Sequence, residues 1–295
     1  MNKIINLGVI GFNEKNGHPY SFSAIINGYN KFFFKKIGYK NIYRYLEKRN
    51  KKDFGIPKVK ITHCWSQNYS KTLSLSKACL IENPVRDINQ MINEVDAVII
   101  ARDDWKSHYP LAIKFLRKRK PVFIDKPLSL SIRQLKTFQK YIKKGLLFST
   151  SALRFSNEVL SLRKFLKTSG QIKLIIANVP GNIEKYGVHI LEFLSVLDLL
   201  KPLEIKRITN NYKSYSVKLK KNIFFLINCL ENKPFTVNVT FVCKKKYLYI
   251  NFTDNFVFFK NTLKAFIQMI YKKKEIIPYK QTLNIMNLIR NIKRK

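Results

Sequence analysis

The sequence predicts an α/β protein, in which a doubly wound parallel sheet precedes an α+β part built on a largely antiparallel open sheet. Short apolar runs alternate with helical patterns over the first half, which is typical of βαβ units. The second half carries long period-2 alternation instead, which favours antiparallel strands with one wet face. A length of 295 residues favours two domains over one. We therefore expect domains at 1–150 and 151–295.

Buried strands are expected in the first half where β-branched runs end at a glycine or a polar loop. They fall at 4–12, 59–65, 97–101, 121–124 and 146–149. Helical spacing separates them, starting near residue 20 and recurring around 88–92, over 105–119 and over 130–144, where Gly145 is the expected C-cap.

The second half is expected to open with a helix over 188–200, which Pro202 stops. Alternating patterns then predict strands at 205–209, 215–219, 223–230, 235–243, 247–252 and 256–259. Two closing helices are expected over 263–271 and 281–292. No internal repeat interrupts this order.

The net charge of +38 allows two interpretations. One is a binder of nucleic acid or of an anionic membrane. The other is compositional drift, since 44 Lys and 27 Asn against only 12 Arg are what A/T-rich codons produce. The basic residues are spread along the whole chain rather than gathered in one stripe, which favours drift. We expect no specific nucleic-acid partner, and polyanion binding stays an alternative.

The cysteine and histidine content argues against disulfide-stabilised and metal-binding classes of protein. The four Cys have no short spacing, which argues against a disulfide scaffold or a zinc module, and the four His add no metal-ligand spacing. We therefore expect no metal. No apolar run approaches the ~20 residues of a spanning helix, and the first residues show no cleavable signal. The expected compartment is the cytoplasm.

Three polar segments follow the predicted parallel strands, at Gly11–Gly17, Arg102–His108 and Asp125–Pro127. Ligands of open parallel sheets bind off the carboxyl ends of the strands, so these segments are the candidate site.

The first segment is a degraded form of the G-x-G-x-x-G loop that binds dinucleotides. Gly11 is present, Asn13 replaces the second glycine, and Gly17 stands one residue late. Asn tolerates a positive φ better than most residues, so the turn can form. An ordinary βα loop without a nucleotide stays open as an alternative. The acid that holds ribose hydroxyls is also missing, because Ser66 follows the second strand, and this leaves NAD and NADP undecided.

Two side chains stand out as candidate catalysts. Lys126 ends a parallel strand and precedes Pro127, so its ammonium can stabilise a developing alkoxide. His189 lies at the start of a predicted helix and suits a general acid/base role, with a half-buried structural histidine as the alternative. Glu192 shares its helical face and would orient the imidazole or bind substrate.

These segments, in this order, resemble the Gfo/Idh/MocA family of nicotinamide-dependent sugar oxidoreductases. The matching motifs are VIG at Val9–Gly11, VDAVIIA at Val95–Ala101, His108, DKP at Asp125–Pro127, Leu153–Arg154–Phe155 and GVH at Gly187–His189. The resemblance implies a Rossmann NAD(P)-binding domain and a C-terminal domain whose open sheet covers the substrate cleft and often builds oligomers. It implies hydride transfer between nicotinamide and a hydroxyl-bearing carbon of a sugar, in carbohydrate metabolism.

The resemblance also implies residue roles. Lys126 would bind the reacting hydroxyl, and His189 would exchange its proton. The cofactor, NAD or NADP, would contact Gly11, Phe12, Asn13, Gly17, Ser66, Arg102, Asp103, His108, Asp125 and Lys126. The substrate would contact Arg154, Lys185, His189 and Glu192.

One further departure concerns the substrate. Lys185 stands where the family's D-x-G-x-H carries its Asp, and a Lys suits a carboxylate or phosphate on the substrate. Together with the degraded loop, it motivates a second hypothesis, a non-catalytic relative that uses the cleft or the basic surface to bind a ligand or partner. The main hypothesis is the oxidoreductase, which would act in surface-polysaccharide or nucleotide-sugar metabolism.

Overall fold

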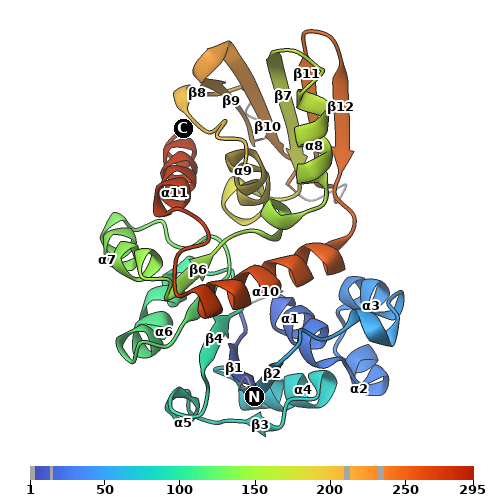
Figure 1. Ribbon diagram of the computed structural model, residues 1–295, viewed down its shortest axis with the longest axis vertical. Coiled ribbons are helices and arrows are strands. Elements are labelled where there is room, and N and C mark those ends of the chain that lie inside the picture. The colour runs from blue at the N-terminus through green and yellow to red at the C-terminus, as the bar shows by residue number, and fades with distance from the viewer. Residues whose placement is uncertain (1–3, 14–15, 209–212, 232–235) are drawn as a thin grey trace. The chain divides into compact units, whose positions relative to one another are not determined.

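The structure is a computed structural model that describes residues 4–13, 16–208, 213–231 and 236–295 (Figure 1). Glu14 and Lys15 of the predicted cofactor loop lie outside these ranges, as do Thr209 and Phe235 at the ends of two predicted strands. The chain forms two compact units. The first comprises Met1–Ser149 and Phe259–Tyr279, and the second comprises Thr150–Phe258 and Lys280–Lys295. The units are therefore not two consecutive stretches, because a late segment belongs to the first.

The first unit is built on a six-stranded parallel sheet in the order β3-β2-β1-β4-β5-β6. The strands are β1 (Ile5–Ile10), β2 (Val59–Trp65), β3 (Asn83–Pro84), β4 (Ala97–Ile100), β5 (Val122–Ile124) and β6 (Leu147–Ser149). The β4 run AVII is buried throughout, as a strand covered on both faces must be. The order reverses direction between β1 and β4, and this is where doubly wound sheets bind ligands.

The helices of this unit are α1 (His18–Asn27), α2 (Lys31–Lys36), α3 (Lys40–Glu47), the 3₁₀ turn η1 (Lys51–Asp53), α4 (Tyr69–Cys79), α5 (Asn89–Ile92), α6 (Trp105–Arg117) and α7 (Ile132–Lys143). Gly145 follows α7 with φ +65°, which agrees with the expected C-cap. Between the neighbouring parallel strands β1 and β2, the chain adds α2, α3 and η1 after α1. A single helix is the usual connection between two such strands.

Helix α10 (Asn255–Lys272) corrects one prediction, because residues 256–259 are helical rather than a strand. The aromatic residues have high β propensity, but tertiary packing uses them at helical spacing. Phe259 packs on Phe22 at a centroid distance of 5.2 Å, and Phe266 packs on Phe123 and Phe148 at 5.7 and 6.0 Å. These contacts attach the late segment to the first unit (Figure 1).

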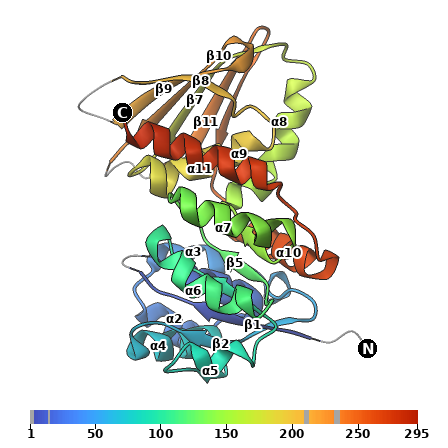
Figure 2. The ribbon, with the colours of Figure 1, turned by 90° about the vertical axis from the view of Figure 1, so that its left-hand side faces the viewer.

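The second unit is built on a sheet in the order β12-β11-β7-β10-β9-β8. The strands are β7 (Ile172–Val179), β8 (Pro202–Arg207), β9 (Lys213–Leu219), β10 (Ile223–Cys229), β11 (Asn238–Cys243) and β12 (Tyr247–Asn251). Only the described pair β7 and β10 is parallel, so the sheet is largely antiparallel, as predicted. Figure 2 shows these strands from a second side.

The remaining elements of the second unit are the 3₁₀ turns η2 (Ala152–Phe155) and η4 (Lys220–Asn222), the π-helical turn η3 (Ile183–Gly187), and helices α8 (Glu158–Leu166), α9 (Val188–Ser195) and α11 (Tyr279–Lys293). Helix α9 ends earlier than the predicted residue 200. Its Phe193 packs on Phe241 of β11 at 6.5 Å, so one face of the sheet carries the core. The opposite face leaves Phe224 of β10 44% exposed.

The cysteines are buried thiols. All four are free and buried, and burial raises the pKa of Cys64 and Cys229 to about 12. The thiols of Cys64 and Cys229 therefore stay protonated, and a protonated thiol is a poor nucleophile. Within the described ranges, no helix has both the length and the apolar character needed to cross a bilayer.

Candidate active site

Arg102 joins three loops at the carboxyl edge of the parallel sheet. It follows β4, and its Nη1 donates to the Phe12 carbonyl after β1 at 2.5 Å and to Gln67 Oε1 after β2 at 2.8 Å. Its Nε and Nη2 form a fork on the Asp104 carboxylate at 2.8 and 2.9 Å. The guanidinium is buried, so these charge-assisted bonds hold the edge as one piece.

The glycine loop bonds to the loop after β4. Asp103 N donates to Asn13 Oδ1 at 3.1 Å, and Asn13 Nδ2 donates back to the Asp103 carboxylate. Gly11 is required by close packing, because a Cβ there would stand 2.5 Å from Pro19 Cγ in the first turn of α1. A Cβ on Gly17 would stand 2.4 Å from Ile42 Cδ1. The sequence-predicted residues Gly11, Asn13, Gly17 and Asp103 thus lie together.

Two predicted cofactor contacts, Ser66 and His108, form hydrogen bonds with other residues of the chain. The Ser66 hydroxyl is buried and bonds to the Asn68 carbonyl at 2.7 Å and to Thr72 Oγ1 at 2.9 Å. His108 is fully buried, with Nδ1 3.0 Å from the Leu128 carbonyl and Nε2 2.9 Å from the Arg102 carbonyl. Burial lowers the pKa of His108. Both residues therefore brace the loops that surround the edge of the sheet.

Asp125 and Lys126 follow β5, and both are buried. Asp125 Oδ1 accepts the Lys126 backbone N–H at 2.9 Å, and Oδ2 is bonded to His18 Nδ1 at the start of α1. The peptide that carries the predicted catalytic Lys126 is thus tied to the helix that follows the glycine loop. Sequence reasoning left His18 without a role, although its position directly after Gly17 was a usable signal.

The second unit positions His189 separately. Its Nδ1 lies 2.5 Å from Ser151 Oγ, and its ring packs 6.2 Å from the Tyr186 ring. The π-helical turn η3 precedes it, and Asn182 caps this turn by accepting the Lys185 N–H at 2.8 Å. Turns of this kind inside helices often mark functional positions. Lys185 and His189 are both half-buried.

Arg154 and Glu192, both predicted substrate contacts, form an ion pair with each other. Arg154 Nε donates to Glu192 Oε2 at 2.6 Å, and the same oxygen accepts the Thr150 hydroxyl at 3.0 Å. Arg154 also donates to Gln281 Oε1 at 2.8 Å and to the Ser195 hydroxyl. The two charged side chains are 7% and 2% exposed.

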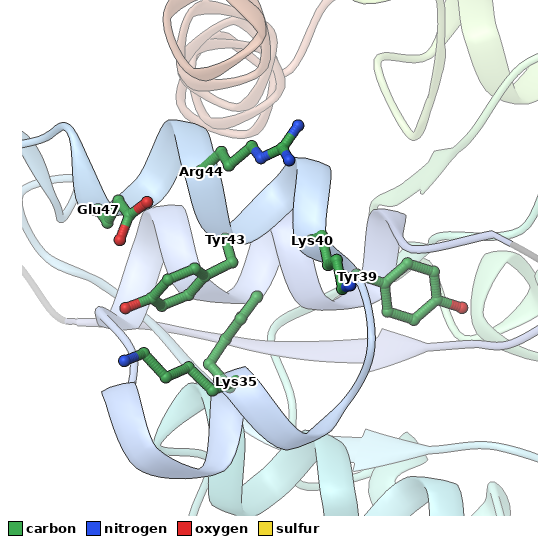
Figure 3. Close-up of a pocket in the computed structure, with 7 residues that line it drawn as sticks. Lys35, Tyr39, Lys40, Tyr43, Arg44 and Glu47 are labelled. Carbon is green, nitrogen blue, oxygen red and sulfur yellow. The ribbon is translucent and has the colours of Figure 1, made fainter.

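A surface pocket of 310 Å³ lies between α2 and α3 (Figure 3). Lys35, Lys40, Arg44, Tyr39, Tyr43, Glu47 and Phe34 line it. Figure 3 shows the Arg44 and Lys35 side chains extending in different directions, so these cations do not converge on one point. The pocket resembles the solvated basic surface expected of a chain with this composition. In the described part of the chain, no three His, Cys, Asp or Glu side chains gather as a metal site requires.

Comparisons with known proteins agree with the fold. Residues 27–149 match the model of the Gfo/Idh/MocA family, described as an oxidoreductase family with an NAD-binding Rossmann fold. This match confirms the predicted resemblance. A search of curated proteins gives no match.

Solved structures match over nearly the whole length. A myo-inositol 2-dehydrogenase from Lactobacillus plantarum is 12% identical, with a TM-score of 0.78 and coverage of 99% of this chain and 97% of that one. A scyllo-inositol dehydrogenase from Lactobacillus casei, solved with NAD(H) and scyllo-inositol, is 15% identical, with 0.74 and coverage of 99% and 96%. A 3-ketoreductase from Actinomadura kijaniata, solved as a mutant with TDP-benzene and NADP, is 13% identical, with 0.74 and coverage of 99% and 98%. At these identities the likeness confirms the predicted fold.

Proposed function

We propose that the protein is an NAD(P)-dependent oxidoreductase that acts on a hydroxyl-bearing carbon of a sugar or sugar derivative. The observation that carries the proposal is the family match over 27–149, on a sheet whose β1, β4 and β5 ends hold the glycine loop, Arg102 and Lys126. The first unit would bind the cofactor, and the second would bind substrate and build oligomers. Surface-polysaccharide or nucleotide-sugar metabolism is the setting we propose.

The residues at the start of α1 fit a dinucleotide phosphate. The helix has no acidic residue in its first turn, and its N-cap Gly17 has no side chain, so its N-terminal dipole favours an anion. The first helical N–H, that of His18, is donated to Asn16 Oδ1 at 2.8 Å. Gly11 keeps the loop close to the helix, since a Cβ there would meet Pro19. Ser66 stands after β2, where a carboxylate would bind the ribose hydroxyls, and its own hydroxyl is already hydrogen-bonded to Asn68 and Thr72. The proposal therefore includes both NAD and NADP.

When bound, the nicotinamide accepts or donates a hydride. We assign to Lys126 the binding of the reacting hydroxyl, because its backbone is fixed by Asp125 at the carboxyl end of β5. An ammonium in a buried position stabilises a developing alkoxide more strongly than one in water.

We assign the proton exchange to Nε2 of His189. Ser151 engages Nδ1, which sets the orientation of the ring, and an imidazole suits acid/base work near neutral pH. Lys185, four residues earlier and half-buried, would hold a carboxylate or phosphate of the substrate. Arg154 and Glu192 support this part of the second unit through their mutual ion pair.

The open face of the second sheet is the surface we assign to self-association. On it, Phe224 is 44% exposed and Tyr249 is 55% exposed, on strands β10 and β12. Exposed aromatic side chains on a sheet face are typical of an interface between subunits. We also propose a cytoplasmic location, because four free buried cysteines suit a reducing compartment.

The decisive experiment is nucleotide binding by tryptophan fluorescence, with NADH and NADPH titrated separately. Both tryptophans are well placed as reporters, since Trp65 ends β2 and Trp105 begins α6, at the carboxyl edge of the sheet. We expect saturable quenching by at least one nucleotide. If neither binds at millimolar concentration, the proposal is wrong.

Turnover is then screened with inositols, free sugars and nucleotide-linked sugars. Lys126→Ala and His189→Ala should each lower turnover by on the order of 10²–10⁴-fold while the far-UV spectrum is unchanged. Matched controls are Lys143→Ala, an exposed lysine at the end of α7, and His63→Ala in β2. Equal losses in the controls would contradict the assigned roles.

A further inference from the structure

His18 occupies a position that no motif assigns. It is the first residue of α1, and its side chain is 22% exposed. The ring packs against Phe22 of α1 at 5.3 Å and against Phe259 of α10 at 5.2 Å. Its Nδ1 bonds to Asp125 Oδ2. Three elements of the first unit therefore hold the imidazole in one orientation.

The Asp125 carboxylate uses both of its oxygens. Oδ1 accepts the Lys126 N–H at 2.9 Å, and Oδ2 takes the bond from His18. An ionised carboxylate can only accept, so Nδ1 of His18 carries the hydrogen. The side chain of Asp125 is only 4% exposed, and a buried carboxylate needs such partners. One carboxylate thereby links the start of α1 to the peptide that carries Lys126.

We propose that His18 is a positioning residue, which acts through Asp125 to couple dinucleotide binding at α1 to the placement of Lys126. This role rests on the proposed function, since it needs a dinucleotide phosphate at the start of α1. Without His18, the buried Asp125 carboxylate would lose one of its two bonds. Its uncompensated charge would then lie at the edge where the phosphates bind, and the Asp125–Lys126 peptide would lose its link to the helix.

The test is a double-mutant cycle on nucleotide affinity. His18→Ala should weaken binding of the better nucleotide about ten-fold, the cost of one charge-assisted hydrogen bond. His18→Asn keeps an N–H near the position of Nδ1 and should restore affinity to within about three-fold of the parent. In the Asp125→Ala background, His18→Ala should have little further effect, because the partner is already removed. His63→Ala is the control.

A structural role alone predicts a different pattern, in which His18→Ala weakens binding equally in both backgrounds and His18→Asn does not rescue it. That pattern overturns the inference, and so does unchanged affinity in His18→Ala. If the parent protein binds neither nucleotide, the proposed function fails first, and the positioning role fails with it.

A second measurement uses the unaltered chain, in case the variants do not fold. Imidazole NMR signals of the four histidines are recorded during titration with the nucleotide. The His18 signals should shift on saturation, while those of His63 stay in place. Binding without a shift at His18 would overturn the coupling.

Discussion

The Arg154–Glu192 pair allows a sharp prediction about stability. Both side chains are nearly fully buried, and Nε and Oε2 are 2.6 Å apart. Removing one partner of a buried pair leaves an uncompensated charge, which costs about 3–5 kcal/mol, whereas replacing both with apolar groups is often neutral. Glu192→Leu and Arg154→Leu should therefore each lower the urea midpoint of the second unit by roughly 2 M, at a slope of about 2 kcal/mol per M. The double variant should recover most of this loss.

Detection must follow the second unit, because both tryptophans lie in the first. Hydrogen exchange of peptides from α9, read by mass spectrometry along a urea series, reports that unit directly. The exposed pair Lys206 and Glu204 is the control, and Glu204→Gln should leave the midpoint unchanged. A cost below about 1 kcal/mol for both single variants, or a double variant as unstable as their sum, would refute the reasoning.

Three further predictions concern the sheet edge and the open face. Gly11→Ala should destabilise the first unit by about 1–3 kcal/mol and weaken nucleotide binding, because its Cβ would stand 2.5 Å from Pro19, and urea unfolding followed by tryptophan fluorescence measures this. Burial lowers the pKa of His108 from its usual 6.5, so the unfolded chain takes up this proton first. Stability present above pH 6.5 should therefore fall as the pH drops below it, with a shallower slope in His108→Gln. Phe224→Lys should shift the protein to a smaller species in sedimentation, and an unchanged mass would argue against the open face as the interface.

Much of the fold follows from periodicity. The predicted strand 59–65 coincides with β2, and the helix expected over 130–144 is α7 with its Gly145 cap. The four-residue apolar run AVII is rich in β-branched residues and is bounded by polar segments, which favoured the buried strand that β4 forms. The segment 256–259 was misassigned because four residues of FVFF fit both periods. The packing of Phe259 on Phe22, continued by Phe266 on Phe123, selects the helix.

The site divides in the same way. Chain order alone brought Gly11, Arg102 and Lys126 to one edge, because parallel neighbouring strands end on the same side of a sheet. It had no means to show that Arg154 and Glu192 neutralise each other, since 38 residues separate them and burial decides whether a charge needs a partner. Nor could it pair His18 with Asp125, 107 residues apart. The sequence by itself determined which strand ends hold the candidate site residues. The tertiary structure decided which buried charged side chains pair with one another, because burial is what makes a partner necessary.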